Sequence, residues 1–178
     1  MNYIKISKCD IANGTGIGVV LWVSGCNCHC HGCHNPQTWD FNVGQLFTED
    51  TMQELLDVLN KPYISRLTLS GGHPLESQNL ETVYQIVKTV KEKFPNKKIW
   101  LYTGYTWEEI LNNDRENKRA NTNSISPLDI VRCCDILVDG KYEKDKRDIS
   151  LAFAGSSNQR VIDIQKSFKQ NKVVLFCD

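Results

Sequence analysis

The sequence predicts an α/β fold with mainly parallel strands, built as an open, partial (β/α) barrel. Short apolar stretches typical of strands alternate along the chain with segments whose apolar residues recur every three or four positions. This alternation is typical of strand-helix-strand units with parallel strands. A complete (β/α)8 barrel usually needs about 250 residues. Because the chain has 178 residues, we expect a single domain, 1–178, that forms only part of such a barrel.

Four short apolar stretches are predicted to be the strands of this sheet. They cover residues 19–23, 66–70, 99–102 and 135–139. Residues 1–18 are interpreted as a lead-in to the first strand. In the tail, residues 160–164 and 173–176 are predicted to be two further strands, which could pair as a hairpin. We treat the segment from about 161 to 178 as a C-terminal extension of the domain.

Two amphipathic helices are predicted between the first three strands. Thr51 and Glu54 have the spacing of a capping box, and the helix that follows is expected to end near Pro62. In residues 80–94, apolar side chains recur at three and four positions, and a proline comes directly afterwards. This pattern predicts a longer helix with one buried face.

The segment between the third and fourth strands is predicted to contain two short helices and a loop. The first helix is expected around residues 108–111. From Asn112 to Ser124 the chain has one alanine and otherwise only polar or charged residues, so we interpret about 112–125 as a solvated loop insertion. Ser126 followed by Pro127 is typical of a helix start, with serine as the cap.

Half of the eight cysteines lie in one loop, residues 26–33, directly after the first predicted strand. Thiolates so concentrated are metal ligands more often than core residues. Cys26, Cys30 and Cys33 have the spacing C-x3-C-x2-C, whereas a structural zinc site needs four ligands. Three thiolates suit an iron-sulfur cube with one iron open to an outside ligand. We interpret Cys28 as a bystander, and a zinc-binding module stays an alternative.

Glycines follow the other three predicted strands at Gly71-Gly72, Gly104 and Asp139-Gly140. In open α/β sheets, ligands bind beyond the carboxyl ends of parallel strands. The cysteine loop follows the first strand in the same way. We therefore expect four strand ends to converge on one mouth that holds the reactive group.

Several short motifs, together with the cysteine spacing, resemble those of a known family. The spacing resembles the signature of radical S-adenosylmethionine (SAM) enzymes. More narrowly, the chain is similar over about residues 1–160 to activating proteins of anaerobic ribonucleoside-triphosphate reductases. The motifs that carry this similarity are Asn13-Gly14, Val23-Ser24-Gly25-Cys26, Gly32-Cys33-His34-Asn35, Thr38-Trp39, Leu69-Ser70-Gly71-Gly72-His73-Pro74-Leu75, Trp100-Leu101-Tyr102-Thr103-Gly104-Tyr105, Val138-Asp139-Gly140-Lys141-Tyr142 and Gly155-Ser156-Ser157-Asn158-Gln159.

The resemblance implies an oxidoreductase with the partial barrel of radical SAM type. Such an enzyme cleaves SAM reductively at one [4Fe-4S] cluster and generates the glycyl radical of the anaerobic (class III) reductase. No catalytic residue is expected beyond the cluster and SAM, because the cofactors carry the chemistry. Activation of a different glycyl-radical enzyme, or zinc binding without catalysis, are the alternatives.

The resemblance also implies the residues of the site. Cys26, Cys30 and Cys33 would hold the cluster. The residues expected to contact SAM are Gly32, Cys33, His34, Gly71, Gly72 and His73. The family usually has an acidic residue after the two glycines, which pairs with the SAM ammonium, and here His73 stands instead. A neutral imidazole can accept one hydrogen bond but adds no negative charge. The alternative is a surface histidine in a turn.

The expected partners also follow from the resemblance. They are the large reductase subunit, with its glycine loop as the protein substrate, and a low-potential electron donor such as flavodoxin. The chain has 21 basic and 21 acidic residues, so no charge excess predicts nucleic acid or an acidic membrane. No apolar run approaches the roughly 18 residues of a membrane span. We expect a cytoplasmic protein.

Overall fold

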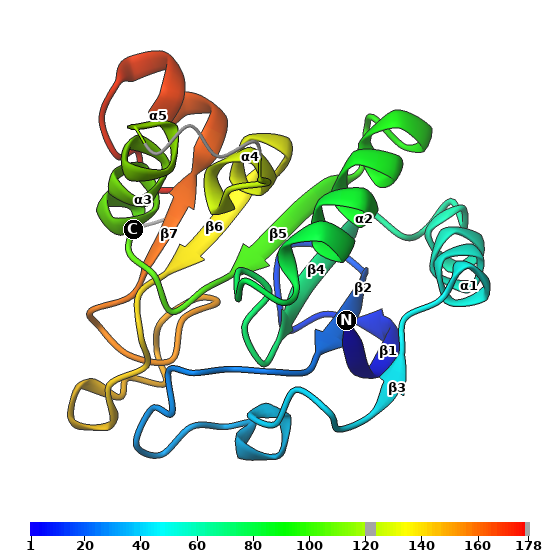
Figure 1. The fold of residues 1–178 in the computed structure, drawn as a ribbon, viewed down its shortest axis with the longest axis horizontal. Helices are drawn as coiled ribbons and strands as arrows, with labels where there is room; N and C mark the ends of the chain where they lie inside the picture. Colours follow the sequence, from blue (N-terminus) through cyan, green and yellow to red (C-terminus); the bar gives the residue numbers. More distant parts are fainter. Residues whose placement is uncertain (120–123, 177–178) are drawn as a thin grey trace.

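The fold is a mixed α/β structure around one open sheet of seven strands (Figure 1). We describe it from a computed structural model that covers residues 1–119 and 124–176, with only the backbone for 115–119. The strand order in the sheet is β3-β1-β2-β4-β5-β6-β7. Its middle consists of four parallel strands, which are β2 (Gly18–Val23), β4 (Arg66–Gly71), β5 (Lys98–Tyr102) and β6 (Ile136–Asp139). The four strands predicted from the sequence are thus confirmed.

Antiparallel strands flank the parallel ones on both sides. On one side β1 (Asn2–Asp10) pairs with β2, and β3 (Gln45–Leu46) pairs with β1. On the other side β7 (Arg160–Asp163) pairs with β6. The interpretation of residues 1–18 as a mere lead-in is therefore wrong. Among the β1 residues only Tyr3 is buried, so the strand depends on backbone pairing with β2 rather than on an apolar pattern.

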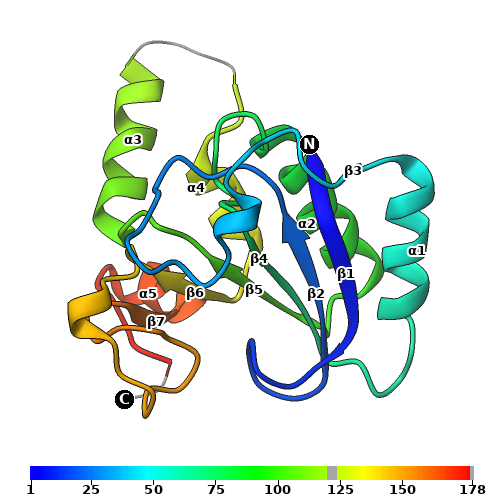
Figure 2. The same cartoon turned by 90° about the horizontal axis from the view of Figure 1, so that it is seen from below.

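Successive side chains of the parallel strands point to opposite faces of the sheet, and each face carries its own cluster of buried residues. Residues such as Leu21, Leu69 and Leu101 point to one face, where they form the main core with buried residues from all five helices. The opposite face carries a smaller cluster around Trp100 and Val138. Figure 2 shows the helices and the loops at the strand ends from below. The five helices are α1 (Glu49–Leu59), α2 (Leu80–Lys93), α3 (Trp107–Arg119), α4 (Pro127–Cys133) and α5 (Ile164–Gln170).

The helix starts agree with the sequence in two cases and differ in one. Ser126 caps α4 and forms a capping box with Asp129. The helix predicted over 80–94 is α2. Helix α1, however, is capped by Thr48, whose side chain accepts a hydrogen bond from the Thr51 N–H at 3.3 Å. The capping box predicted at Thr51 therefore lies about one helical turn after the true helix start. Glu49 and Asp50 already form the acidic first turn that favours a helix start.

The prediction of a solvated loop from Asn112 is corrected by the structure. Helix α3 continues to Arg119, so the segment read as a solvated loop from Asn112 is helical up to that residue, and residues 120–123 lie outside the described part of the chain. Asp114 ties this helix to α4 by accepting a hydrogen bond from Ser126 Oγ at 3.1 Å. Arginine, glutamate and lysine also favour helix almost as strongly as alanine does.

The tail forms an antiparallel pair, but it is not a simple hairpin. Helix α5 lies between β7 and the end of the tail, where, among the residues up to 176 that the structure describes, only Leu175 forms an isolated bridge, to Ile162. Two backbone hydrogen bonds extend this contact, from Asp163 N to Val174 O and from Phe176 N to Val161 O. The second predicted strand is therefore reduced to a bridge. Asp163 caps α5 by accepting from the Lys166 N–H, which starts a helix where the sequence suggested continued strand.

An ion pair between Arg66, in β4, and Asp10, at the end of β1, fixes the start of the turn between β1 and β2. The Arg66 side chain is fully buried and lies 2.6 Å from Asp10 Oδ1. Its guanidinium also donates to Asp10 O and to Thr68 Oγ1. A Cβ on Gly14 would lie 2.8 Å from Arg66 Nε, so the turn packs closely on the arginine.

We expect Asp10→Ala to lower the free energy of unfolding by about 3–5 kcal/mol, because it leaves the buried Arg66 charge without its carboxylate. Chemical denaturation measures this change. Lys8→Ala is the matched control, since the Lys8–Glu54 pair is largely exposed and its loss should cost about 0–1 kcal/mol. Equal losses in the two variants would contradict the role assigned to Arg66.

Candidate metal centre

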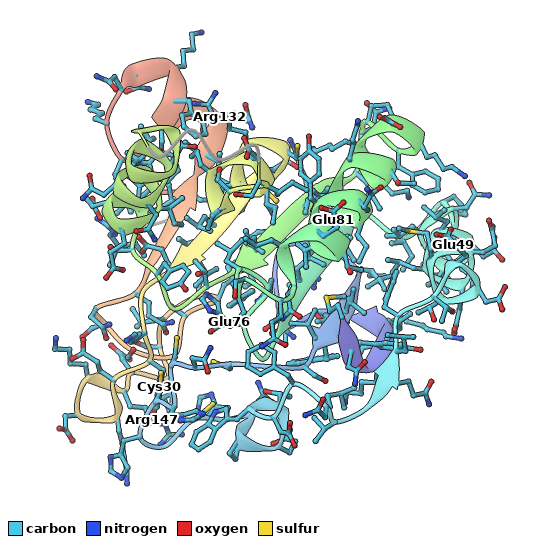
Figure 3. All side chains as sticks on the ribbon, in the orientation of Figure 1. Cys30, Glu49, Glu76, Glu81, Arg132 and Arg147 are labelled. Atoms are coloured by element: carbon cyan, nitrogen blue, oxygen red, sulfur yellow. The ribbon has the colours of Figure 1, made fainter. Side chains whose placement is uncertain are left out.

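The four parallel strands end at one cavity of about 310 Å³. Residues that follow β2, β4, β5 and β6 all line it, as the sequence predicted. They include the four cysteines of the loop 26–33 and the glycines Gly71, Gly72, Gly104 and Gly140. Figure 3 labels Cys30 and Glu76 on this side of the molecule, below the helices. The cavity therefore lies where ligands bind in parallel α/β sheets.

Backbone contacts between the cysteine loop and the turn after β4 fix the position of the loop. Gly25 O accepts a hydrogen bond from the His73 N–H, and Val23 O accepts one from the Gly72 N–H, both at 2.8 Å. A Cβ on Gly72 would lie 2.6 Å from Gly25 O, and one on Gly71 would lie 2.8 Å from the backbone of Val23. Only glycine allows this approach. Gly71 and Gly72 thus join the loop to the sheet as well as lining the cavity.

Cys30 and Cys33 lie in the same turn of the loop. The Cys33 N–H donates to Cys30 O at 3.0 Å, and the Asn35 N–H donates to Cys33 Sγ at 3.3 Å. Burial raises the pKa of the Cys30 thiol, although a hydrogen bond from the Tyr142 backbone favours its thiolate. Hydrogen bonds to sulfur of this kind favour a charged ligand and orient it.

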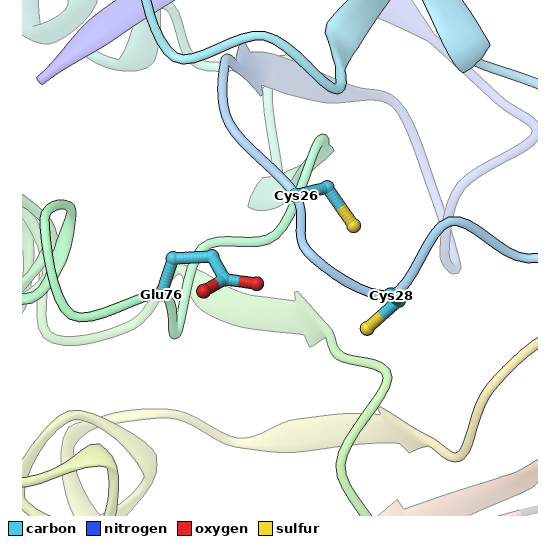
Figure 4. Close-up of side chains that lie close together, drawn as sticks. All are labelled: Cys26, Cys28 and Glu76. Atoms are coloured by element: carbon cyan, nitrogen blue, oxygen red, sulfur yellow. The ribbon is translucent and has the colours of Figure 1, made fainter.

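Cys28 lies much closer to Cys26 than its interpretation as a bystander implies. Cys26 Sγ, Cys28 Sγ and a Glu76 carboxylate oxygen all lie within 4.8 Å of one another (Figure 4). A hydrogen bond from the Cys28 thiol lowers the pKa of Cys26 and raises that of Cys28. A Cβ on Gly104 would lie 2.6 Å from Cys28 Sγ. A carboxylate from the turn after β4 therefore lies beside two thiols of the loop.

Glu76 is the site residue that the sequence did not reveal. Its Oε1 accepts a hydrogen bond from the Asn27 N–H at 2.9 Å, and its Oε2 accepts one from Asn27 Nδ2 at 2.8 Å. Burial raises the pKa of this carboxyl, but hydrogen bonds from His73 and Asn27 outweigh that effect and lower it to about 2. Because Glu76 is far from Asn27 in sequence, no local pattern could have predicted the contact.

His73 is buried, which excludes the alternative of a surface histidine in a turn. Its Nδ1 lies 3.0 Å from Glu76 Oε1, and its Nε2 lies 2.7 Å from Thr103 Oγ1. Its ring also makes an edge contact with the Tyr105 ring, with centroids 4.5 Å apart. Both nitrogens are engaged, so this arrangement leaves no ring lone pair for a ligand, although the residue lines the cavity.

The remaining predicted site residues lie around the mouth. Cys33 and His34 line the cavity, and His34 contacts the Tyr142 ring with centroids 5.0 Å apart. Gly32, by contrast, is exposed and does not line the cavity; its φ is 75°, and a Cβ there would approach the Lys144 side chain at 3.1 Å. Sequence reasoning assigned no role to several lining residues, namely Asn13, Trp22, Ser70 and Tyr102.

Comparison with known proteins decides the family. A family model described as a 4Fe-4S single cluster domain matches residues 12–162. A protein of Enterobacteria phage T4, named anaerobic ribonucleoside-triphosphate reductase-activating protein, is 44% identical over 161 residues, which are 90% of this chain and 93% of that protein. The chain belongs to this family of activating proteins. The family model confirms the expectation of a [4Fe-4S] cluster.

Bacterial members of the family are similar over the same length. Proteins with the same name from Pasteurella multocida and Escherichia coli K12 are 40% and 37% identical, over 89% and 90% of this chain and over 95% and 97% of their own lengths. The similarity to family members thus includes the cysteine loop, the turn after β4 and the rim of the cavity. Within the described residues, no helix is long and apolar enough to cross a membrane.

We expect Glu76→Gln to remove part of the acid sensitivity of the fold. The folded-state pKa of Glu76, about 2, lies below its ordinary value of 4.5, so the carboxylate stabilises the fold fully above about pH 4.5 and less as the pH falls toward 2. Denaturation of the protein without metal at pH 5 and pH 3 should show a smaller loss of stability in the variant. An unchanged pH dependence would contradict this role of Glu76.

Proposed function

We propose that the chain is the activating enzyme of an anaerobic (class III) ribonucleoside-triphosphate reductase and that Cys26, Cys30 and Cys33 hold its [4Fe-4S] cluster. The observation that carries the proposal is that these cysteines line one cavity at the ends of the parallel strands, in a chain that matches this family over most of its length. The relatives are named reductase-activating proteins, and we assign to this enzyme the generation of a glycyl radical on the reductase.

The arrangement of the three thiols suits a cluster better than a single ion. Among the described residues, the Sγ atoms of Cys26, Cys30 and Cys33 are not all within 4.8 Å of one another. A cube carries each thiolate on a different iron, so its ligands lie farther apart than those around one metal ion. The thiols also share one wall of a cavity that is large enough for more than a single ion. The donor set therefore fits the cluster.

SAM is assigned to the part of the same cavity between the cysteine loop and the strand ends. We assign Gly71 and Gly72 to its methionine end, because backbone without side chains can approach a ligand closely. Gly32, Cys33 and His34 flank the other side of the mouth. When bound, the cluster and SAM would supply the one-electron radical chemistry that removes a hydrogen atom from the reductase glycine.

His73 is assigned to the wall of this SAM site rather than to a direct bond with the ammonium. Both of its ring nitrogens already have partners, one of which is the buried carboxylate of Glu76. The negative charge that other members have directly after the glycines is supplied here by Glu76, three residues later. A buried carboxylate near the mouth favours a cationic ligand. His73 keeps that carboxylate in place.

The chain's own residues position the cofactors and exclude water from them. Trp22, Trp39, Tyr102 and Tyr142 add aromatic surface to the cavity, and a site shielded in this way protects a reactive intermediate. Asp139 holds the rim by accepting hydrogen bonds from the Trp107 N–H and from Arg160.

We further propose that the whole chain, 1–178, is one domain and that its open sheet is a partial barrel of radical SAM type.

The partner assignments follow from the same proposal. The reductase's glycine loop would enter the cavity past Lys141 and Tyr142, which line it next to the cysteine loop. A low-potential donor such as flavodoxin would reduce the cluster. The enzyme would act in the cytoplasm, where both partners are expected.

Anaerobic reconstitution tests the function. The wild-type chain should bind about four iron atoms per chain, turn brown and release 5'-deoxyadenosine from SAM when reduced, whereas Cys26→Ser, Cys30→Ser and Cys33→Ser should each lose at least about tenfold of this activity. Cys133→Ser should behave as the wild type, because that thiol lies outside the cavity. A wild-type protein that is first freed of zinc with a chelator and still takes up no iron and stays colourless would overturn the proposal.

The protein substrate is tested separately. Mixing the reconstituted enzyme with an anaerobic ribonucleoside-triphosphate reductase should give the doublet electron-spin signal of a glycyl radical on the reductase. Cleavage of SAM without that signal, together with a signal on another glycyl-radical enzyme, would show that the enzyme activates a different partner.

A further inference from the structure

The cysteine loop contains a second set of metal donors that overlaps the proposed cluster site. Cys26 Sγ, Cys28 Sγ and a Glu76 carboxylate oxygen lie within 4.8 Å of one another. Figure 4 shows the two thiols and the carboxylate converging from the loop and from the turn after β4. Cys30 and Cys33 do not belong to this group. The set therefore differs from the three cysteines assigned to the cluster.

We propose that these three residues form a single-ion site for a divalent metal of the zinc type when the cluster is absent. Two thiolates and a carboxylate are ligands that Zn²⁺ accepts, with water in the fourth position. At the usual bond lengths, ligand atoms around a tetrahedral zinc lie about 3.5–3.8 Å apart. The observed separations, up to 4.8 Å, need only small side-chain rotations to reach those values.

The surroundings hold the donors in place for such an ion. Glu76 is fixed by Asn27 and His73, so its carboxylate is already oriented toward the loop. Cys28 Sγ is held against Gly104, where any larger residue would push the thiol away. A histidine or amide hydrogen-bonded to a metal-binding carboxylate is the usual support of a metal ligand. His73 and Asn27 have that position here.

The consequence for regulation rests on the proposed function. Cys26 belongs to both sets, so an ion held by Cys26, Cys28 and Glu76 occupies one of the three thiolates that the cluster needs. Zinc bound to the apoprotein would therefore block cluster assembly. Cys28 is the residue that decides this competition, because it serves the single ion and not the cluster.

Zinc titration of the full-length apoprotein, reduced and kept anaerobic, tests the site. With a chromophoric chelator as competitor, we expect one Zn²⁺ per chain, at least about tenfold weaker binding in Cys28→Ser, and unchanged affinity in the matched control Cys33→Ser. Titration with Co²⁺ should show thiolate charge-transfer bands that fall by about half in Cys28→Ser, as two sulfur ligands become one. Circular dichroism verifies that each variant is folded.

Unchanged zinc affinity in Cys28→Ser, or an equal loss in Cys33→Ser, would overturn the site. These measurements need no cluster, so they are independent of whether the protein assembles one. The competition is tested by adding one equivalent of Zn²⁺ before iron and sulfide. The wild type should then lose most of its iron, and Cys28→Ser should keep it. Equal iron in both would refute the competition, whereas no iron in either protein without zinc would refute the proposed function.

Discussion

The close packing of the cysteine loop on the turn after β4 is the constraint on which the site depends. Gly72 meets Gly25 so tightly that a Cβ would lie 2.6 Å from its carbonyl oxygen, and the His73 N–H donates to that same oxygen. Asn79 adds a hydrogen bond from its side chain to Ser24 O at 2.9 Å. Without these contacts, the loop between β2 and β3 would be an exposed segment with few contacts to the rest of the fold. The contacts therefore give the metal-binding segment the fixed position that a metal centre requires.

The same turn decides the charge of the site. Glu76 is buried with its two oxygens bonded to Asn27 and one of them also to His73. A buried carboxylate without such partners would carry a large desolvation penalty. The network keeps a negative charge beside His73, which lines the cavity that we assign to cationic SAM, and it brings the carboxylate to the thiols of Cys26 and Cys28. In our proposals, the hydrogen-bond network of Glu76, Asn27 and His73 thus contributes both to SAM binding and to the competition between a cluster and a single metal ion.

The parts of the fold that the sequence predicted have strong local signals. The strand of residues 19–23 is wholly apolar, residues 67–69 are apolar or β-branched, and α2 has a regular apolar face. The errors arose where tertiary contacts outweighed local preference. β1 has a single buried residue and exists through pairing with β2, and α3 extends through a polar stretch in which Asp114 is tied to Ser126.

The sequence by itself determined the class of fold and the kind of chemistry, because strand-helix alternation and the C-x3-C-x2-C spacing are local properties of the chain. It also placed glycines after the parallel strands, and parallel strands bring their ends to one edge. Only the tertiary structure decided the position of Glu76 beside Cys26, the engagement of both His73 nitrogens and the approach of Cys28 to Gly104. Except for the bond between His73 and Glu76, these contacts join residues that are 30 or more positions apart, and their distances depend on how the strands are arranged, which no local pattern encodes.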